Sequence, residues 1–334
     1  MKAFNNLFYC TSALQLLTAF EARSTFGGDN NLMILNSDPD EASLNNLSSL
    51  TSTLAWSEIR YLNRQRKSRF LAQLRITREL EEGRFNRIFI GEWSSFARIL
   101  FHNLRFDEAY LLDDGTATIR QQRELCDPDR YLGLKKRLWD KYRDFRFKAF
   151  GLKTSSQREL KFYSAFIKEK ISSEKIIVHS FNYLRSQFNG DGRRFIEKTA
   201  FIGTNLIGAG LCDASRMQLL HQFFDKNFSP GEIVDYYLHR SENENLLRAY
   251  LTQSRYNLIP YRGPLELNLL AKDATPRTVV STISSALVTI KVMFPDIQAV
   301  ALDVSQLTGR SGPADWFYDL FEQHNIQVIK VPLT

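Results

Sequence analysis

The chain has 334 residues, of which 43% are hydrophobic and 24% are charged, and its formal net charge is +7. This is the composition of a globular protein long enough for two domains of ordinary size, and it excludes a disordered, collagen-like or disulfide-stapled chain. The excess of basic residues favours an anionic partner without identifying it.

The first part of the chain has the pattern of alternating strands and helices. Residues 7–10 form a short apolar run, and Ser12 with Gln15 three residues later predicts a capping box for a helix that follows. Further strands are predicted at 33–35, 87–90 and 109–112, with helical patterns between them. This alternation implies a parallel sheet, whose ligands bind at the carboxyl ends of the strands.

The same N-terminal residues have one feature of a targeting segment. Residues 7–20 have the length of a signal-peptide core, but they follow a single Lys and continue into a charged helical pattern. No stretch of the chain approaches the roughly 20 apolar residues that a bilayer crossing needs. These features favour a cytoplasmic protein.

Two segments, 60–78 and 134–150, are rich in basic residues and are expected to be helical. In the second, apolar residues recur at helical spacing, so that one face is apolar and the remainder is basic. Such a helix can be an ordinary solvated surface, or it can contact an anionic membrane or glycolipid. Nucleic-acid binding is a further interpretation, but the chain has no helix-turn-helix, zinc-finger or RNA-recognition signature.

An acidic pair follows the strand predicted at 109–112. Asp113 and Asp114 come directly after this apolar run, and Gly115 allows a sharp exit from it. Adjacent residues of an extended chain point to opposite sides, so one carboxylate can face a substrate while its neighbour binds backbone amides. A transferase that activates a sugar hydroxyl needs one such base. Asp-Asp-Gly is also common turn chemistry, and both interpretations stay open.

The alternation resumes in the second half of the chain. Residues 121–183 are mainly helical and charged in pattern, and Asn189-Gly190-Asp191-Gly192 then interrupts the chain. Strands are predicted after it at 199–203, 234–238, 279–280, 299–302 and 326–331, with helices at 214–228 and from Ser284. The predicted fold class is α/β, with two Rossmann-like domains facing one cleft. The domains are residues 1–192, with a helical insertion at about 121–183, and residues 193–334.

Three features of the second domain can carry chemistry. His239 follows the strand pattern at 233–238, where an imidazole can assist a leaving phosphate or serve a structural role. Hydroxyl residues at 281–285 precede an apolar helix pattern, and there N-capping and phosphate binding use the same geometry. Glu266 follows a Gly-Pro break, where a carboxylate can accept hydrogen bonds from ribose hydroxyls or favour a first helical turn.

The sequence predicts no metal site and no disulfide framework. The cysteines are odd in number, far apart and without CxxC spacing: Cys10, Cys126 and Cys212. The remaining histidines have no metal-ligand spacing to His239 or to one another: His102, His179, His221 and His324.

Taken in order, these motifs resemble the bacterial sialyltransferases of glycosyltransferase family 52 and the related bacterial polysialyltransferases. That family has an Asp/Glu-Asp/Glu-Gly motif, then a His-Pro motif and then a paired Ser/Thr motif, on a two-domain GT-B fold. The counterparts here are Asp113-Asp114-Gly115, His239-Arg240 and Ser284-Ser285. The segments CTSALQLLTAFEA and FIGTNL resemble the openings of the family's two domains, so the likeness spans about residues 7–295.

The resemblance implies a role for each matching residue. Asp114 would be the general base that deprotonates the acceptor hydroxyl, and His239 would assist the departure of CMP. Ser284 and Ser285 would bind the phosphate of CMP, and Glu266 would hold its ribose. Such enzymes invert the anomeric centre in one displacement, need no metal for the chemistry and use no cofactor beside the CMP-sugar donor.

Arg240 stands where the family has proline. Arginine does not restrict the backbone of His239 as proline would, and it adds a cation beside the leaving group. Arg240 can contact the phosphate or the carboxylate of the donor, or it can mark a donor other than ordinary sialic acid.

The leading interpretation is transfer of sialic acid, or a related nonulosonic acid, from its CMP ester to a terminal sugar such as galactose. The acceptor glycan is expected to be lipid-linked, as in lipooligosaccharide or capsule, and peripheral contact with an anionic inner membrane fits this location. The alternative keeps the fold and uses CMP-Kdo or a UDP- or GDP-hexose as donor. Nucleic acid is not an expected partner.

Overall fold

A computed structural model describes residues 4–37, 56–63, 68–166, 172–187, 194–251, 255–272, 274–308 and 314–332. The chain divides into two compact units, Met1–Leu184 and Arg185–Thr334. The boundary predicted between residues 192 and 193 falls within the segment 188–193, which lies outside the described residues.

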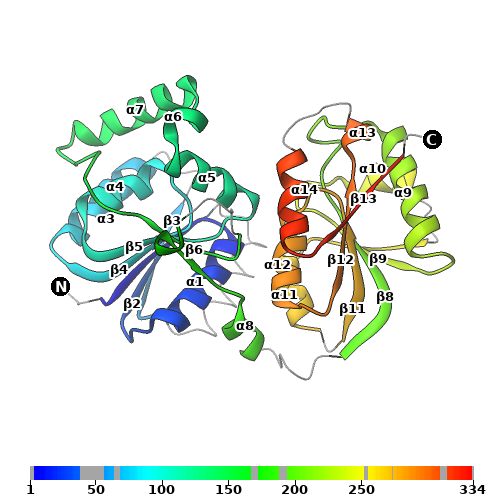
Figure 1. The fold of residues 1–334 in the computed structure, drawn as a ribbon. Coiled ribbons are helices and arrows are strands. Elements are labelled where there is room, and N and C mark those ends of the chain that lie inside the picture. Colours follow the sequence, from blue (N-terminus) through cyan, green and yellow to red (C-terminus); the bar gives the residue numbers. More distant parts are fainter. Residues whose placement is uncertain are drawn as a thin grey trace. The chain divides into compact units, whose positions relative to one another are not determined.

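The first unit is built on a sheet of seven parallel strands in the order β3-β2-β1-β4-β5-β6-β7 (Figure 1). The strands are β1 (Asn6–Cys10), β2 (Asn31–Ser37), β3 (Glu58–Asn63), β4 (Arg84–Ile90), β5 (Arg105–Leu111), β6 (Lys161–Ser164) and β7 (Ile176–Val178). The helices are α1 (Ala13–Phe26), α3 (Arg69–Glu81), α4 (Ser95–Asn103), α5 (Thr116–Cys126), α6 (Pro128–Tyr131), α7 (Leu134–Lys148) and α8 (Asn182–Gln187), with a 3-10 turn η1 (Ser173–Lys175). The order reverses direction between β1 and β4, which is where open parallel sheets bind ligands.

The second unit has six parallel strands in the order β10-β9-β8-β11-β12-β13. They are β8 (Arg194–Ile202), β9 (Val234–Tyr237), β10 (Tyr256–Ile259), β11 (Ala274–Ser281), β12 (Gln298–Asp303) and β13 (Gln327–Lys330). The helices are α9 (Ala214–Phe228), α10 (Glu244–Tyr250), α11 (Leu265–Leu270), α12 (Ser285–Met293), α13 (Ser305–Thr308) and α14 (Ala314–Gln323). Here the strand order reverses direction between β8 and β11, and this position is called the switch point below.

The central strands are apolar because both faces of each sheet are covered. All five residues of β1 are buried, and four consecutive residues of β12 are buried. Continuous apolar runs of this kind are typical of parallel strands with helices on both sides. The strands predicted at 7–10, 33–35, 87–90 and 109–112, and those of the second unit, are confirmed.

Four strands were not predicted: β3, β6, β7 and β10. The last three have only three or four residues each, too few to show a pattern. The segment 121–183, expected to be helical, therefore also contains β6 and β7. The expectation of one helix over 60–78 is wrong, because residues 58–63 form β3 and the described helix begins at Arg69.

The start of α1 differs from a reciprocal capping box. The Ser12 side chain caps the helix by accepting a hydrogen bond from the Gln15 backbone N–H, as predicted. The Gln15 side chain, however, accepts from the Thr11 backbone N–H at 2.7 Å. Gly91, which follows β4, makes this possible, because a Cβ there would lie 2.1 Å from Oε1 of Gln15.

A buried histidine in the second unit makes stability depend on pH. Burial lowers the pKa of His221 to about 3, so the unfolded chain binds its proton more readily than the folded one. The contribution of neutral His221 to the free energy of unfolding is therefore fully present above the ordinary histidine pKa. It falls as the pH drops below that value, by about 1.4 kcal/mol per pH unit at most. We expect the free energy of unfolding in urea to fall less between about pH 7 and about pH 5 in His221→Phe than in the wild type.

The hydroxyl of Tyr256 keeps a partner in this variant, since it also donates to Asp225 at 2.6 Å. The matched control is His324→Phe, because His324 directly follows α14 and is partly exposed. Equal pH slopes for the wild type and His221→Phe would refute the assignment.

Candidate active site

Asp113 ties together the carboxyl ends of three strands of the first unit. It follows β5, is fully buried, and accepts hydrogen bonds from the Ser164 hydroxyl and from the Ala165 backbone N–H, the latter at 2.7 Å. His179, which follows β7, places Nε2 at 3.0 Å from Oδ2 of Asp113. The Tyr163 ring stacks on this imidazole at 4.6 Å. The carboxylate of Asp113 is therefore occupied by structural contacts.

Asp114 lies beside it at the same edge and is only partly buried. Its Oδ1 accepts a hydrogen bond of 3.1 Å from the hydroxyl of Ser12, the residue that caps α1. Its backbone N–H donates to Thr118 Oγ1 at 2.7 Å, which fixes the turn into α5. Gly115 has a φ of 61°, so the exit from β5 uses a conformation that favours glycine. Within the described part of the chain, Oδ2 of Asp114 has no hydrogen-bond donor, so this oxygen can accept a proton from a substrate.

In the second unit, hydroxyl residues collect at the switch point. Thr204 follows β8 and Thr282 follows β11, and their hydroxyl oxygens lie 2.6 Å apart. Ser281 Oγ donates to the Ile202 carbonyl at 2.8 Å, which joins the same two strand ends. This is the position where the doubly wound fold presents a helix N-terminus to a ligand.

The predicted serine pair stands at the start of α12, directly after this junction. Ser284 is the N-cap, and its Oγ accepts from the Ala286 backbone N–H at 3.3 Å. Ser285 is the first residue of the helix, and both serines are partly exposed. The backbone N–H groups of Ala286 and Leu287 donate to Ser284, which leaves the Ser285 amide and the serine hydroxyls at the helix start for an anion.

Glu266 is buried on α11 and contacts the helix that begins with these serines. Its Oε1 accepts a hydrogen bond from Thr289 Oγ1 on α12. Burial raises the pKa of this carboxyl, and the Thr289 hydroxyl opposes the rise. The structure thus brings Glu266 and Ser284-Ser285 onto adjoining helices, and ribose binding by Glu266 stays a prediction.

His239 follows β9, which neighbours β8 in the sheet. Its Nδ1 accepts from the Ser241 backbone N–H at 3.3 Å and lies 2.8 Å from the Ser241 hydroxyl. A backbone N–H can only donate, so Nδ1 is the acceptor and the neutral ring carries its proton on Nε2. Desolvation of the ring, followed by the charge of Arg240, lowers the pKa of His239. At neutral pH the residue is therefore an uncharged hydrogen-bond donor through Nε2.

Arg240→Gln tests this electrostatic coupling. Removal of the positive charge leaves only desolvation to oppose protonation, so we expect the pKa of His239 to rise. The measurement is an NMR titration of the imidazole signals, assigned with His239→Gln. Arg248→Gln on α10 is the matched control and should leave the titration unchanged. A lower or unaltered pKa in Arg240→Gln would contradict the coupling.

Glu242 holds the loop of His239, and no sequence motif singles it out. Its Oε2 accepts from the His239 backbone N–H at 2.7 Å, and its Oε1 accepts from the Tyr236 hydroxyl at 2.9 Å. Gly203, after β8, leaves no room for a side chain, because a Cβ would lie 2.0 Å from Oε2 of Glu242. Glu242 thereby fixes the strand ends of β8 and β9 against each other.

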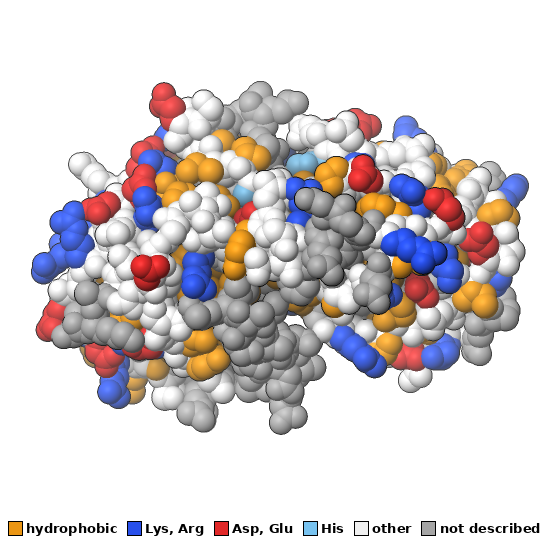
Figure 2. All heavy atoms as spheres, turned by 90° about the horizontal axis from the view of Figure 1, so that it is seen from below, with side chains coloured by type: hydrophobic (Ala, Val, Ile, Leu, Met, Phe, Trp, Pro, Cys, Tyr) orange, Lys and Arg blue, Asp and Glu red, His pale blue; other side chains and the backbone are white. Residues whose placement is uncertain are grey.

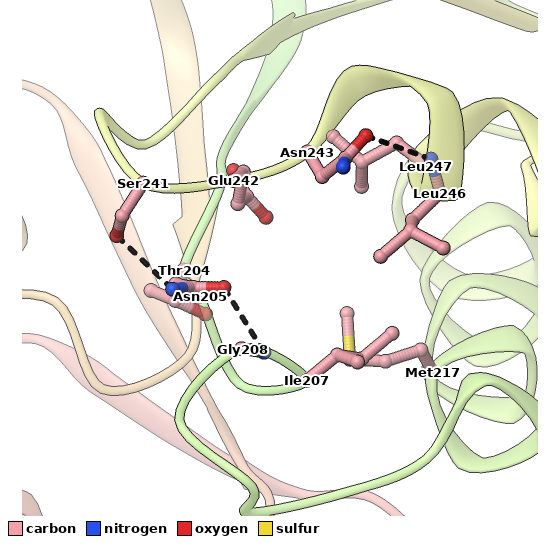
Figure 3. Close-up of a pocket in the computed structure, with 10 residues that line it drawn as sticks. All are labelled: Thr204, Asn205, Ile207, Gly208, Met217, Ser241, Glu242, Asn243, Leu246 and Leu247. Carbon is pink, nitrogen blue, oxygen red and sulfur yellow. Dashed lines mark hydrogen bonds between the residues drawn. The ribbon is translucent and has the colours of Figure 1, made fainter.

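Figure 3 shows the small cavity beside Glu242, of about 80 Å³. Polar groups of the loops after β8 and β9 form one side, with Asn205 Nδ2 donating to Ser241 Oγ at 3.1 Å. Apolar side chains form the other: Ile207, Met217, Leu246 and Leu247. A cavity of this size holds a few water molecules and no nucleotide. The cavity is therefore a packing feature of the loops after β8 and β9 and not a donor-binding pocket.

A larger cavity of about 500 Å³ lies in the first unit and is separate from the acidic pair. Its lining comes largely from the last turns of α4 and α5 and from the residues before β6, including His102, Cys126 and Arg158. Burial, then the charges of Arg98 and Arg158, lowers the pKa of His102 to about 4. Because Asp114 precedes α5 and Cys126 ends it, this cavity is at the other end of that helix from the candidate site.

Among the residues described, His, Cys, Asp and Glu side chains form no group of three or more that could hold a metal ion. None of the helices in the described ranges combines the length and apolarity needed to cross a bilayer.

No protein-family model matches the chain, and no curated protein matches it. Among solved structures, UDP-GlcNAc 2-epimerase from Methanocaldococcus jannaschii has a TM-score of 0.54 at 10% identity, over 98% of this chain and 88% of that one. The UDP co-structure of MnaA from S. aureus has a TM-score of 0.50 at 12% identity, over 93% and 81% of the two chains. The E. coli heptosyltransferase WaaC with ADP-2-deoxy-2-fluoro heptose has a TM-score of 0.44 at 10% identity, over 98% and 94%.

At such low identity these similarities concern the fold alone. The two parallel sheets, each in doubly wound order, agree with it. The predicted fold class is thus confirmed: the chain has the GT-B fold, with two Rossmann-like domains.

Proposed function

We propose that this chain is an inverting glycosyltransferase that transfers sialic acid, or a related nonulosonic acid, from its CMP ester to a terminal sugar of a glycan. The observation that carries the proposal is the difference in contacts and exposure between the two residues of the acidic pair. Asp113 is saturated by contacts from β6 and β7, whereas Asp114 is partly exposed with one oxygen available. A lone, oriented carboxylate at the carboxyl end of a parallel strand suits a general base.

In the proposed reaction, Asp114 takes the proton of the acceptor hydroxyl while its oxygen attacks the anomeric carbon of the donor. The bond between that carbon and the phosphate oxygen of CMP breaks as the new glycosidic bond forms, which inverts the centre. The leaving phosphate would receive hydrogen bonds from Nε2 of His239 and from the start of α12 at Ser284 and Ser285. Negative charge on that phosphate increases in the transition state, so donors aimed at it lower the barrier.

The binding of CMP is supported differently from the binding of phosphate. The hydroxyls and amides at the switch point of β8 and β11 favour a phosphate in this unit. The resemblance to family 52 is the basis for three further assignments. They are CMP as the nucleotide, Glu266 as the ribose ligand, and Arg240 as a contact to the donor's phosphate or carboxylate. The acceptor, a lipid-linked glycan such as lipooligosaccharide or capsule, follows the resemblance too.

The direct test is release of CMP from CMP-sialic acid, with and without galactosides. We expect release that depends on the acceptor, together with a sialylated product of inverted configuration. CMP-Kdo should be assayed in parallel as the alternative acid donor. Absence of turnover with every CMP-linked sugar acid would refute the proposal.

A second candidate changes the donor to a UDP- or GDP-linked sugar. The solved structures with TM-scores of 0.50 or more include UDP-GlcNAc 2-epimerases, which is why UDP-GlcNAc belongs in the same assay. Product formation from UDP-GlcNAc, inhibited by UMP or UDP and not by CMP, would favour this candidate. An epimer formed without acceptor would identify it as an isomerase.

A further inference from the structure

Helix α7 is oriented with its apolar residues toward solvent. The exposed fractions are 80% for Leu134, 67% for Leu138, 60% for Tyr142 and 67% for Phe145. These residues are spaced by four, four and three positions, so they form one stripe along the helix. Trp139, 52% exposed, widens the stripe. A stripe of this kind ordinarily faces a protein core.

The face of α7 that touches the protein is the acidic one. Arg98 on α4 places Nη2 at 2.8 Å from Oδ1 of Asp144 and 3.4 Å from Oδ1 of Asp140. Phe147 is buried in a small cluster with Ile99 and Leu152. The carboxylates of the helix are thus paired inward, and this anchoring fixes the apolar stripe outward. In Figure 1, α7 lies beyond α4, at the edge of its unit.

Basic side chains border the stripe. The helix has seven Lys or Arg residues and two Asp residues, and Arg98 pairs with both Asp. Three exposed lysines, Lys135, Lys141 and Lys148, have no acidic partner among the described residues. By the helical rotation of about 100° per residue, Lys141 and Lys148 lie along the side of the stripe opposite Trp139, and Lys135 lies next to Trp139. By contrast, the face seen in Figure 2 mixes small apolar groups with both acidic and basic side chains.

We propose that α7 binds the surface of an anionic membrane, with its apolar stripe in the interfacial region and its lysines against the headgroups. An amphipathic helix with Leu, Phe and Trp on one face and Lys and Arg on the other lies in the plane of the interface. Tyr142 and Trp139 combine an apolar body with a polar tip, as residues at that depth do. The inference concerns a surface outside the candidate active site and does not depend on the proposed reaction.

Two other occupants fit these observations less well. A second copy of the chain would bring its own basic α7 against this one, and like charges would meet. A nucleic acid would satisfy the lysines through phosphates, but it would leave Leu134, Leu138 and Phe145 exposed. Of these three occupants, the anionic bilayer surface is the one that takes up both the charge and the apolar area.

The test is flotation of the full chain with vesicles of phosphatidylcholine, alone or with about 30% phosphatidylglycerol. One variant removes apolar area and keeps every charge: Leu134→Ser, Leu138→Ser and Phe145→Ser together. The other removes charge and keeps the stripe: Lys135→Gln, Lys141→Gln and Lys148→Gln together. Ile233→Ser in the second unit, at a residue 66% exposed, is the matched control.

We expect the wild type to partition onto the anionic vesicles and only weakly onto neutral ones, with binding reduced at about 0.5 M salt. The charge variant should lose about 100-fold in partition coefficient, because three lysines no longer attract the anionic headgroups. The apolar variant should lose at least as much, because three large apolar side chains no longer enter the interface. Ile233→Ser should bind like the wild type. The Trp139 fluorescence shift on binding should vanish in Trp139→Phe.

Four results would overturn the proposal. The first is that the wild type does not bind vesicles, and the second is that it binds neutral and anionic vesicles equally. The third is that the wild type forms a dimer, and that the apolar triple variant is monomeric but binds vesicles as the wild type does. The fourth is tight binding of a labelled oligonucleotide that the charge variant loses and the apolar variant keeps. Turnover of soluble substrates should be unchanged in both triple variants, so failure here is distinguishable from failure of the proposed reaction.

Discussion

Asp114→Asn is expected to lower kcat for glycosyl transfer by about 1000-fold while donor binding stays near the wild-type level. The substitution preserves the size of the side chain, and the amide oxygen can still accept the hydrogen bond from Ser12. What is lost is the ability to take a proton from the acceptor hydroxyl. The measurements are single-turnover transfer with saturating acceptor and calorimetric titration with CMP.

The matched control is Asp129→Asn on α6. Its carboxylate is 92% exposed and forms only a surface pair with Arg137, so transfer should be unaffected. If Asp114→Asn retains full activity while a folded Asp113→Asn is inactive, the roles within the pair are reversed. If all three variants transfer normally, the base is another residue.

The sequence predicted the alternation of strands and helices because most strands of both sheets are buried on both faces and appear as continuous apolar runs. Ser12 and Ser284 were recognisable as helix caps because capping is local chemistry, and both residues do cap α1 and α12. In contrast, β3 has a single buried residue, Leu62, and includes charged residues such as Arg60, so its pattern resembles the helix that follows it. Propensity could not separate them.

The site residues that were missed are those defined by contacts between distant segments. His179 is 66 residues from Asp113 in the chain, and only the pairing of β5, β6 and β7 brings them together. Glu242 has no motif of its own, and its importance follows from the closeness of Gly203. Partial signals existed, since a glycine after an apolar run often marks a close approach of the backbone.

The orientation of α7 could not be read from its pattern either. An amphipathic helix is predicted equally well with its apolar face inward or outward. The ion pairs from Arg98 to Asp140 and Asp144 decide the question, and they join α7 to a helix about 40 residues earlier in the chain.

Asp113→Ala is expected to destabilise the first unit by about 3 to 5 kcal/mol, the largest effect on stability that we predict. The substitution leaves the Ala165 backbone N–H and the His179 imidazole without the buried carboxylate that accepts from them. Donors buried without partners cost the full desolvation of each group. Asp113→Asn keeps one acceptor oxygen, so it should lie between Ala and the wild type.

Urea unfolding can be followed in the first unit alone. Trp56, Trp93 and Trp139 belong to it, and a Trp316→Phe background removes the only tryptophan of the second unit. The control Asp114→Ala should change the free energy of unfolding by less than about 1 kcal/mol, because Asp114 is partly exposed and accepts one hydrogen bond from Ser12. The two neighbouring aspartates would then have different roles, since Asp113 would stabilise the fold and Asp114 would take part in the transfer. Equal stability of the two alanine variants would show that the contacts of Asp113 do not tie the three strand ends together.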